Sequence, residues 1–207
     1  VTGVQTCALP ISANTGNDNS AFGTNTLDSN TSGASNTAFG RSALRNNTTA
    51  SNNTAVGYQA GFSNTTGTPI TAIGFAALYS NTTGVSNTAV GYYASYGNTT
   101  GGYNTSVGQQ ALRFTTTGGN NTALGYQALL YNDTASNNVA VGYQAGYYAT
   151  GTTNTHIGAY AGYGVTTGTN NTAIGYGTIG YFAPTYTTGN YNTAVRSEEH
   201  TSELQSH

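Results

Sequence analysis

Side chains with catalytic or metal-binding chemistry are scarce in this chain, of which only 5% is charged. Between residues 13 and 195 there is no Cys, Lys or Glu. Apart from tyrosines, the ionisable residues of that segment are His156, Asp18, Asp28, Asp133, Arg41, Arg45 and Arg113. No nucleophile, base and orienting group can be drawn from this set, and no carboxylate recurs as calcium-binding repeats require. We therefore predict that the chain is not an enzyme and holds no metal or cofactor.

His156 stands in a column of alanines that recurs along the chain, between Thr155 and Ile157. A metal site would need further ligands beside it, and no second ligand falls at the same place in a neighbouring repeat. A pH-sensing role is the other functional alternative. We interpret His156 as a tolerated substitution on the face opposite the core.

The pattern Asn-x-Ser/Thr is dense in this sequence. It occurs at Asn30, Asn46, Asn47, Asn52, Asn64, Asn81, Asn98, Asn104, Asn120, Asn132 and Asn170. Six of these lie at multiples of 17 residues in one expected turn: Asn30, Asn47, Asn64, Asn81, Asn98 and Asn132. A glycan on this column would coat one exposed edge of the molecule. The alternative is that Asn-Thr-Thr simply makes good stacked turns.

Aromatic residues gather next to the same turn. Five of them share one column: Phe62, Tyr79, Tyr96, Tyr147 and Tyr163. An exposed aromatic ladder is a suitable surface for binding sugars or other surfaces. The same residues would equally well pack between the chains of a fibre, and both interpretations stay open.

The element that must position all these residues is a repeat. One glycine recurs every 17 residues, with a single step of 16 before Gly158: Gly23, Gly40, Gly57, Gly74, Gly91, Gly108, Gly125, Gly142, Gly158 and Gly175. No stretch has a period of 3.6 residues, and glycines or Asn-Thr pairs interrupt every segment, so helices are not expected. Self-similarity at a fixed short period predicts an all-β solenoid of about ten 17-residue coils, with parallel strands.

Each coil of this solenoid has two expected faces. In the repeat Thr54-Ala55-Val56-Gly57, the apolar Val56 is expected to point inward. Thr54 shares that face because residues two apart in a strand point the same way. Ala55 and Gly57 then form a small outer face, while Ala60 closes the packing before the turn. One coil buries little apolar surface, so we expect a three-chain fibre in which the small Ala and Gly columns allow close approach.

Stacked coils place like residues above one another, as ladders. One predicted asparagine ladder is Asn36, Asn53, Asn87, Asn104, Asn121, Asn138, Asn154 and Asn171, and the second is the six-residue sequon column. Asp28 and Arg45 are also 17 residues apart, which predicts a salt bridge between neighbouring coils. The step from Gly175 to Arg196, where the next glycine is due, is 21 residues, and its extra residues around Phe182–Pro184 predict a loop.

The two ends of the chain do not carry the repeat. A DNA sequence that encodes Val1–Ile11 also encodes Arg196–Ser206 when its opposite strand is read. Unrelated protein ends have no reason to be reverse complements, and this DNA resembles a sequencing adapter joined to both ends of a fragment. We therefore expect residues 1–12 and 196–207 to be non-native, and residues 13–195 to be the repeat domain of a longer protein.

Composition narrows the partners of this domain. Three arginines balance three aspartates between residues 13 and 195, so there is no basic surface for nucleic acid. No apolar run approaches the roughly 20 residues of a membrane span. The strict register of the repeat and its 17 tyrosines argue against a disordered chain.

The columns described above resemble a known repeat type. Thr54-Ala55-Val56-Gly57 is similar to the core of the head repeats in trimeric autotransporter adhesins, and the longer unit with its Ser-Asn-Thr-Thr-Gly turn resembles repeats of bacterial and phage tail-fibre-like surface proteins. The resemblance implies a left-handed parallel β-roll wound into a trimer, on a cell surface or virion fibre. It implies a structural and adhesive segment that contacts a host surface or glycan through Tyr, Asn and Thr ladders. An ice- or crystal-binding solenoid with flat Thr columns is the alternative function.

Overall fold

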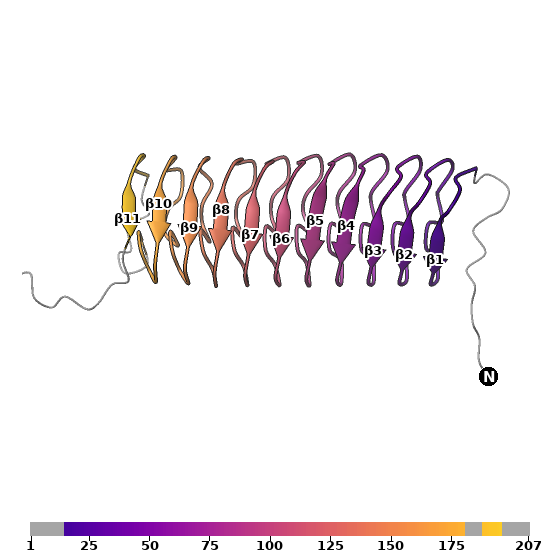
Figure 1. Cartoon of the computed structure of the whole chain (residues 1–207), viewed down its shortest axis with the longest axis horizontal. Coiled ribbons are helices and arrows are strands. Elements are labelled where there is room, and N and C mark those ends of the chain that lie inside the picture. The colour runs from indigo at the N-terminus through magenta and orange to yellow at the C-terminus, as the bar shows by residue number, and fades with distance from the viewer. Residues whose placement is uncertain (1–14, 181–187, 196–207) are drawn as a thin grey trace, which may run out of the picture.

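The computed structural model describes residues 15–180 and 188–195, and in Figure 1 they form one rod of stacked coils. These residues contain eleven short strands and no helix. The strands are β1 (Ser20–Phe22), β2 (Thr37–Phe39), β3 (Thr54–Val56), β4 (Ile70–Ile73), β5 (Asn87–Val90), β6 (Thr105–Val107), β7 (Thr122–Leu124), β8 (Val139–Val141), β9 (Thr155–Ile157), β10 (Thr172–Ile174) and β11 (Thr193–Val195). The terminal segments 1–12 and 196–207 and the predicted loop at Phe182–Pro184 lie outside the described residues.

The strands form a single parallel sheet in the order of the chain. Each column pairs with itself, as when Thr54 aligns with Thr71 and Val56 with Ile73. The register survives the 16-residue step, where Val139 aligns with Thr155, because the missing residue is absorbed outside the strands. The predicted all-β parallel solenoid of about ten coils is confirmed.

The predicted orientation of the strands is wrong. Ala55 is completely buried, whereas Thr54 is only partly buried and Ile73, in the column of Val56, is 38% exposed. The alanine columns therefore line the inside of the coil, and the threonine and aliphatic columns point outward. As a result, the strand alanines cannot form the close contact between chains that the sequence analysis assigned to them.

The inside of the coil is narrow, which is the physical reason for this orientation. Ala55 packs in one cluster with Ala60, from beyond the glycine, and with Leu44 and Leu78. The leucines belong to the column four residues after each glycine, and this column supplies the largest buried side chains of the rod. At the alanine position of the strand, space of that size accepts alanine but not valine or isoleucine.

Exceptions inside the coil occur in matched sets. Where the leucine column holds Gly61, Ile70 is buried on the other side, and a Cβ added to Gly61 would lie 3.4 Å from Cδ1 of Ile70. Where it holds Ser95, the strand alanine is replaced by Ser106, and the two hydroxyl oxygens are 2.8 Å apart. The interior thus keeps its volume and its hydrogen bonds when a residue changes.

Buried asparagine ladders hold the coils together along the axis. In the first ladder, the Oδ1 atom of one Asn accepts the backbone N–H one coil further on, as from Asn53 to Asn36 at 3.0 Å. In the second ladder, hydrogen bonds between side-chain amides run from Nδ2 of each Asn to Oδ1 of the one before it, at 2.7–3.0 Å. They connect Asn30, Asn47, Asn64, Asn81 and Asn98. Both ladders were predicted, but Asn132 is not connected to the second, because Thr115 stands between it and Asn98.

Candidate binding faces of the rod

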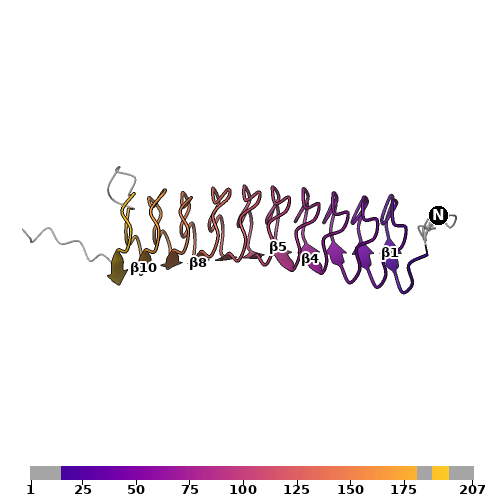
Figure 2. The ribbon, with the colours of Figure 1, turned by 90° about the horizontal axis from the view of Figure 1, so that it is seen from above.

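The sheet forms one long side of the rod, as Figure 2 shows from above. Outward along it run the threonine column and the aliphatic column, which holds Phe22, Phe39, Val56, Ile73, Val90, Val107, Leu124, Val141, Ile157, Ile174 and Val195. In this column Val141 is 37% exposed and Phe39 53%. None of the eleven strands contains Asp, Glu, Lys or Arg. The side is therefore regular, uncharged and partly apolar.

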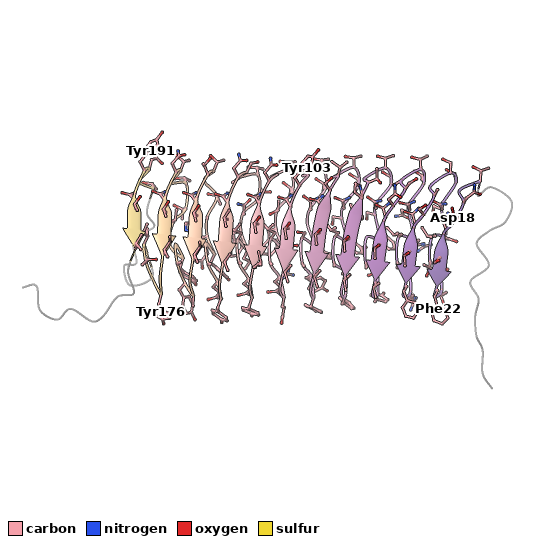
Figure 3. All side chains as sticks on the ribbon, in the orientation of Figure 1. Asp18, Phe22, Tyr103, Tyr176 and Tyr191 are labelled. Carbon is pink, nitrogen blue, oxygen red and sulfur yellow. The ribbon has the colours of Figure 1, made fainter. Side chains whose placement is uncertain are left out.

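The glycine after each of the strands β1–β10 turns the chain at the edge of this side. Gly57 has a φ of 133°, and a Cβ there would lie 2.5 Å from the carbonyl oxygen of Gly74 in the next coil. Only glycine permits this close stacking of backbones. In Figure 3, Phe22 and Tyr176, which flank glycines of this column, lie along the same edge of the rod, opposite Tyr103 and Tyr191. The turn thus brings the aliphatic column and the residues after glycine to one edge.

The residue after the glycine is aromatic in six of the ten coils, and these six residues form a column that sequence reasoning missed. Its rings stack in two runs, with centroids 5.1 Å apart for Tyr58 and Phe75 and also for Tyr126 and Tyr143. Tyr92 continues the first run and is 45% exposed. The signal was the dipeptide Gly-Tyr, repeated at the period of the coil. We call the aliphatic column and this aromatic column together the apolar edge.

The predicted aromatic column is present but divided. Phe62, Tyr79 and Tyr96 stack in sequence, with centroids 5.0 and 5.1 Å apart. Tyr147 and Tyr163 form a separate pair at 5.1 Å. Within each stack the rings face each other along the rod, so they present edges rather than faces to the outside. Sugar rings stack on aromatic faces, so these columns are poor stacking platforms except at their ends.

Charged groups close off part of those ends. The guanidinium carbon of Arg45 lies 5.9 Å from the ring centroid of Phe62, at the start of its stack. Arg45 also lies 3.6 Å from Asp28, which confirms the predicted salt bridge between neighbouring coils.

In the second stack, burial and the neighbouring tyrosines Tyr131 and Tyr148 raise the pKa of Tyr147 to about 12, so its phenol stays neutral.

The six predicted glycosylation residues do not lie on an exposed edge. Their side chains are all inside the coil: Asn30, Asn47, Asn64, Asn81, Asn98 and Asn132 are at most 3% exposed. In Asn47, Asn64, Asn81 and Asn98, the Nδ2 atom that a glycan would modify instead donates within the ladder, as from Asn81 to Oδ1 of Asn64 at 2.8 Å. The expectation that this asparagine column is exposed was wrong. The residues of this turn that face the solvent are the threonines after each Asn, such as Thr31 and Thr49. Asn52, Asn120 and Asn170, from the same dense pattern, are exposed.

His156 also lies inside the coil, contrary to the predicted outer face. Its side chain is completely buried in the alanine column, between Ala140 of β8 and Ala173 of β10. Neither ring nitrogen has a hydrogen-bond partner. Desolvation by burial lowers its pKa to about 4, so the ring is neutral at neutral pH. The sequence signal was the pair Gly146 and Gly162, which stand where other coils have leucine.

No further chemical site accompanies these faces. Within residues 15–180 and 188–195, no group of three His, Cys, Asp or Glu side chains could hold a metal ion. The same residues include no helix able to cross a membrane. Comparison with protein-family models, with curated proteins and with solved structures finds no match to this chain.

Proposed function

We propose that the chain is a structural and adhesive segment of an extracellular fibre, in which three copies associate side by side. The observation that supports this best is the apolar edge. It runs from β1 to β11, and eight of its eleven strand residues are 37–65% exposed in the single chain, from Val141 to Val195, whereas Val56, Val90 and Ile174 are partly buried. Contiguous exposed apolar surface of this kind is typical of protein–protein contacts.

The repeat makes copies of this edge complementary to one another. Two chains that run parallel have the same coil spacing, so apolar residues of one meet apolar residues of the other in every coil. The strands carry no charge that would oppose this contact, and the one charged residue in the column after the glycines is Arg41, which lies over the ring of Tyr58. Each coil adds a similar strip of apolar area, so the interaction grows with the length of the rod. A trimer matches the fold type that the repeat resembles.

The other sides of the rod then remain free for adhesion. The turns before the strands present exposed threonines, including Thr49, Thr83 and Thr117, and the outer columns present tyrosine edges with their hydroxyls. Such neutral polar rows suit a host surface or a glycan held by hydrogen bonds. With no basic patch in the repeat, nucleic acid is not among the proposed partners.

The test is the mass of the chain in solution, measured by sedimentation or light scattering. We expect a trimer for the natural sequence, and a monomer for the variant Val56→Lys/Val90→Lys/Leu124→Lys, which places charges on the apolar edge. The matched control Thr49→Lys/Thr83→Lys/Thr117→Lys adds the same charges to the turns and is expected to leave the trimer intact. A natural sequence that stays monomeric at high concentration contradicts the proposal.

One observation favours a second function, the binding of ice or another crystal. The threonine column points outward on the sheet, with Thr71, Thr88 and Thr105 in consecutive coils at the roughly 4.8 Å spacing of strands. Val139 interrupts this column, and the neighbouring aliphatic column varies in size from valine to phenylalanine. Thermal hysteresis that disappears in Thr71→Lys/Thr88→Lys/Thr105→Lys would establish this function, whereas glycan or cell binding without hysteresis supports the fibre.

A further inference from the structure

The coils around β9 contain a side chain that no other coil has. His156 occupies a strand position that is alanine in β8 and β10, and it fills the interior with an imidazole ring. The room for it comes from two glycines. A Cβ on Gly146 would lie 2.7 Å from Cδ2 of the ring, and a Cβ on Gly162 would overlap Nδ1.

The ring is held without any polar partner. Ser106, the other polar residue of this column, is paired with Ser95 at 2.8 Å, whereas both nitrogens of His156 are unpaired. The second asparagine ladder is also missing here, because its column continues as Ala149 and Val165, both completely buried. The first ladder still passes through these coils at Asn138, Asn154 and Asn171, but its amides are engaged with backbone groups, as where the Asn171 N–H donates to Asn154 Oδ1 at 2.9 Å, and neither ring nitrogen is paired with it.

No charged group compensates the ring from the neighbouring elements. It faces Ala140 from β8, Ala173 from β10, and Gly146 and Gly162 from the opposite wall. The ionisable residues nearest in sequence to those glycines are Tyr147, Tyr148, Tyr160 and Tyr163, which are partly buried and include no carboxylate. The nearest carboxylate in sequence is Asp133, which is exposed and accepts a hydrogen bond from Thr116 at 2.6 Å.

We propose that His156 makes the coils around β9 an acid-sensitive joint of the rod, which opens when the ring is protonated while the coils at β2–β6 stay folded. This proposal does not depend on the function of the fibre. An opened joint exposes both imidazole nitrogens to water and lets the charged ring be solvated. The coils at β2–β6 keep their own asparagine ladder and leucine column, so they stay folded when the joint opens.

The direction of the effect follows from the two protonation states. Burial lowers the pKa of His156 from 6.5 to about 4, so the open form binds a proton more readily than the closed form. The closed form of the coils around β9 therefore has its full stability above pH 6.5, and this stability is lost as the pH falls from 6.5 towards 4. For those two pKa values, the equilibrium for opening is expected to rise about a hundredfold between pH 7 and pH 4.

Hydrogen exchange of the full chain at pH 7 and pH 4, corrected for the intrinsic exchange rate, tests this directly. We expect protection in β8–β10 to fall about a hundredfold and protection in β3–β5 to change little. The variant Gly146→Leu/His156→Ala/Gly162→Leu restores the interior of other coils and is expected to remove the pH dependence. Asp133→Asn is the control for a nearby carboxylate, and should keep it.

A proton titration of the His156 ring by NMR gives a second measurement that needs no variant. A midpoint well below 6, together with acid-dependent exchange confined to the coils around β9, supports the joint. A midpoint near 6.5, unchanged protection in β8–β10 at pH 4, or equal loss of protection along the whole rod would overturn it.

Discussion

Two regions of the rod have the same strand pairing but different buried side chains. In residues 30–98, which we call the ladder region, five asparagines connect through their side-chain amides, with bonds such as Asn98 Nδ2 to Asn81 Oδ1 at 2.7 Å. In residues 139–180, the histidine region, the same column holds Ala149 and Val165, and His156 fills the core. Strand pairing is nonetheless the same in both.

This difference shows that the interior can change in blocks. A residue inside a solenoid contacts its own coil and the coils on either side, so a polar column works only while it is continuous. Where it stops, the last amide has an atom without a partner, as at Oδ1 of Asn98 and at both amide atoms of Asn132. The histidine region avoids this cost by using apolar residues in that column.

The largest expected effect comes from removing the room for the histidine ring. Gly162→Ala and Gly61→Ala are matched changes, because both glycines have left-handed φ angles, 63° and 59°. The Cβ at Gly61 meets side chains at 3.0 and 3.4 Å, whereas the Cβ at Gly162 overlaps the His156 ring. We expect Gly61→Ala to cost about 1–2 kcal/mol and Gly162→Ala about 2 kcal/mol more in urea unfolding.

The double variant His156→Ala/Gly162→Ala separates overlap from backbone strain. In the His156→Ala background, the free energy of unfolding lost through Gly162→Ala should fall to that lost through Gly61→Ala. The ring is then absent, while the φ angle at residue 162 is unchanged. If the two glycine substitutions cost the same free energy of unfolding with His156 in place, the ring does not occupy the space that the structure gives it.

A smaller loss of stability is expected from replacing asparagines of the second ladder's column. Asn81→Ala removes bonds to Asn64 and to the carbonyl oxygen of Gly84, and deprives Asn98 of its acceptor. It should cost about 3 kcal/mol, because the atoms left behind are buried. Asn132→Ala removes two amide atoms that have no partner, and should cost less than about 1 kcal/mol. Equal losses in urea unfolding would show that the ladder adds nothing to the stability of the rod.

Much of the fold follows from the spacing of residues in the sequence. Identical residues 17 apart must stack if each repeat is one coil, so the register, the ladders and the pair Asp28 and Arg45 were all predictable. Which face of each strand points into the coil was not predictable. Alternation says that Thr54 and Val56 share a face, but not that this face is the outer one. The larger apolar residue was expected to be the buried one, but the coil is too narrow for valine at that position and buries alanine instead.

The binding faces were harder to predict for the same reason. Once the strands are turned over, the Val56 column becomes part of the exposed edge, and His156 moves from the surface to the core. The compensating glycines, Gly146 and Gly162, were visible in the sequence, but they mean something only when their column is known to be internal. Asn81 and its equivalents were likewise assigned to the surface because Asn-Thr-Thr is typical of exposed turns.

The smallest expected effect would repair the break in the ladder. Thr115→Asn places an amide between Asn98 and Asn132, where its Nδ2 can donate to Asn98 Oδ1 and its Oδ1 can accept from Asn132. We expect a gain of about 1 kcal/mol in the free energy of unfolding, because two buried atoms acquire partners while the bond from Thr115 Oγ1 to the Asn132 carbonyl is lost. Thr115→Val, which removes only that hydroxyl, is the matched control and should destabilise the rod.

The repaired ladder should also change the role of Asn132. In the natural sequence Asn132→Ala is expected to be nearly neutral, but in the Thr115→Asn background the same change would again leave a buried amide without a partner. Its cost should therefore rise by about 1–2 kcal/mol, measured as the coupling energy of a double-mutant cycle. A coupling near zero would mean that continuity of the column does not decide the energy of its members, and the contrast between the ladder region and the histidine region would then need another cause.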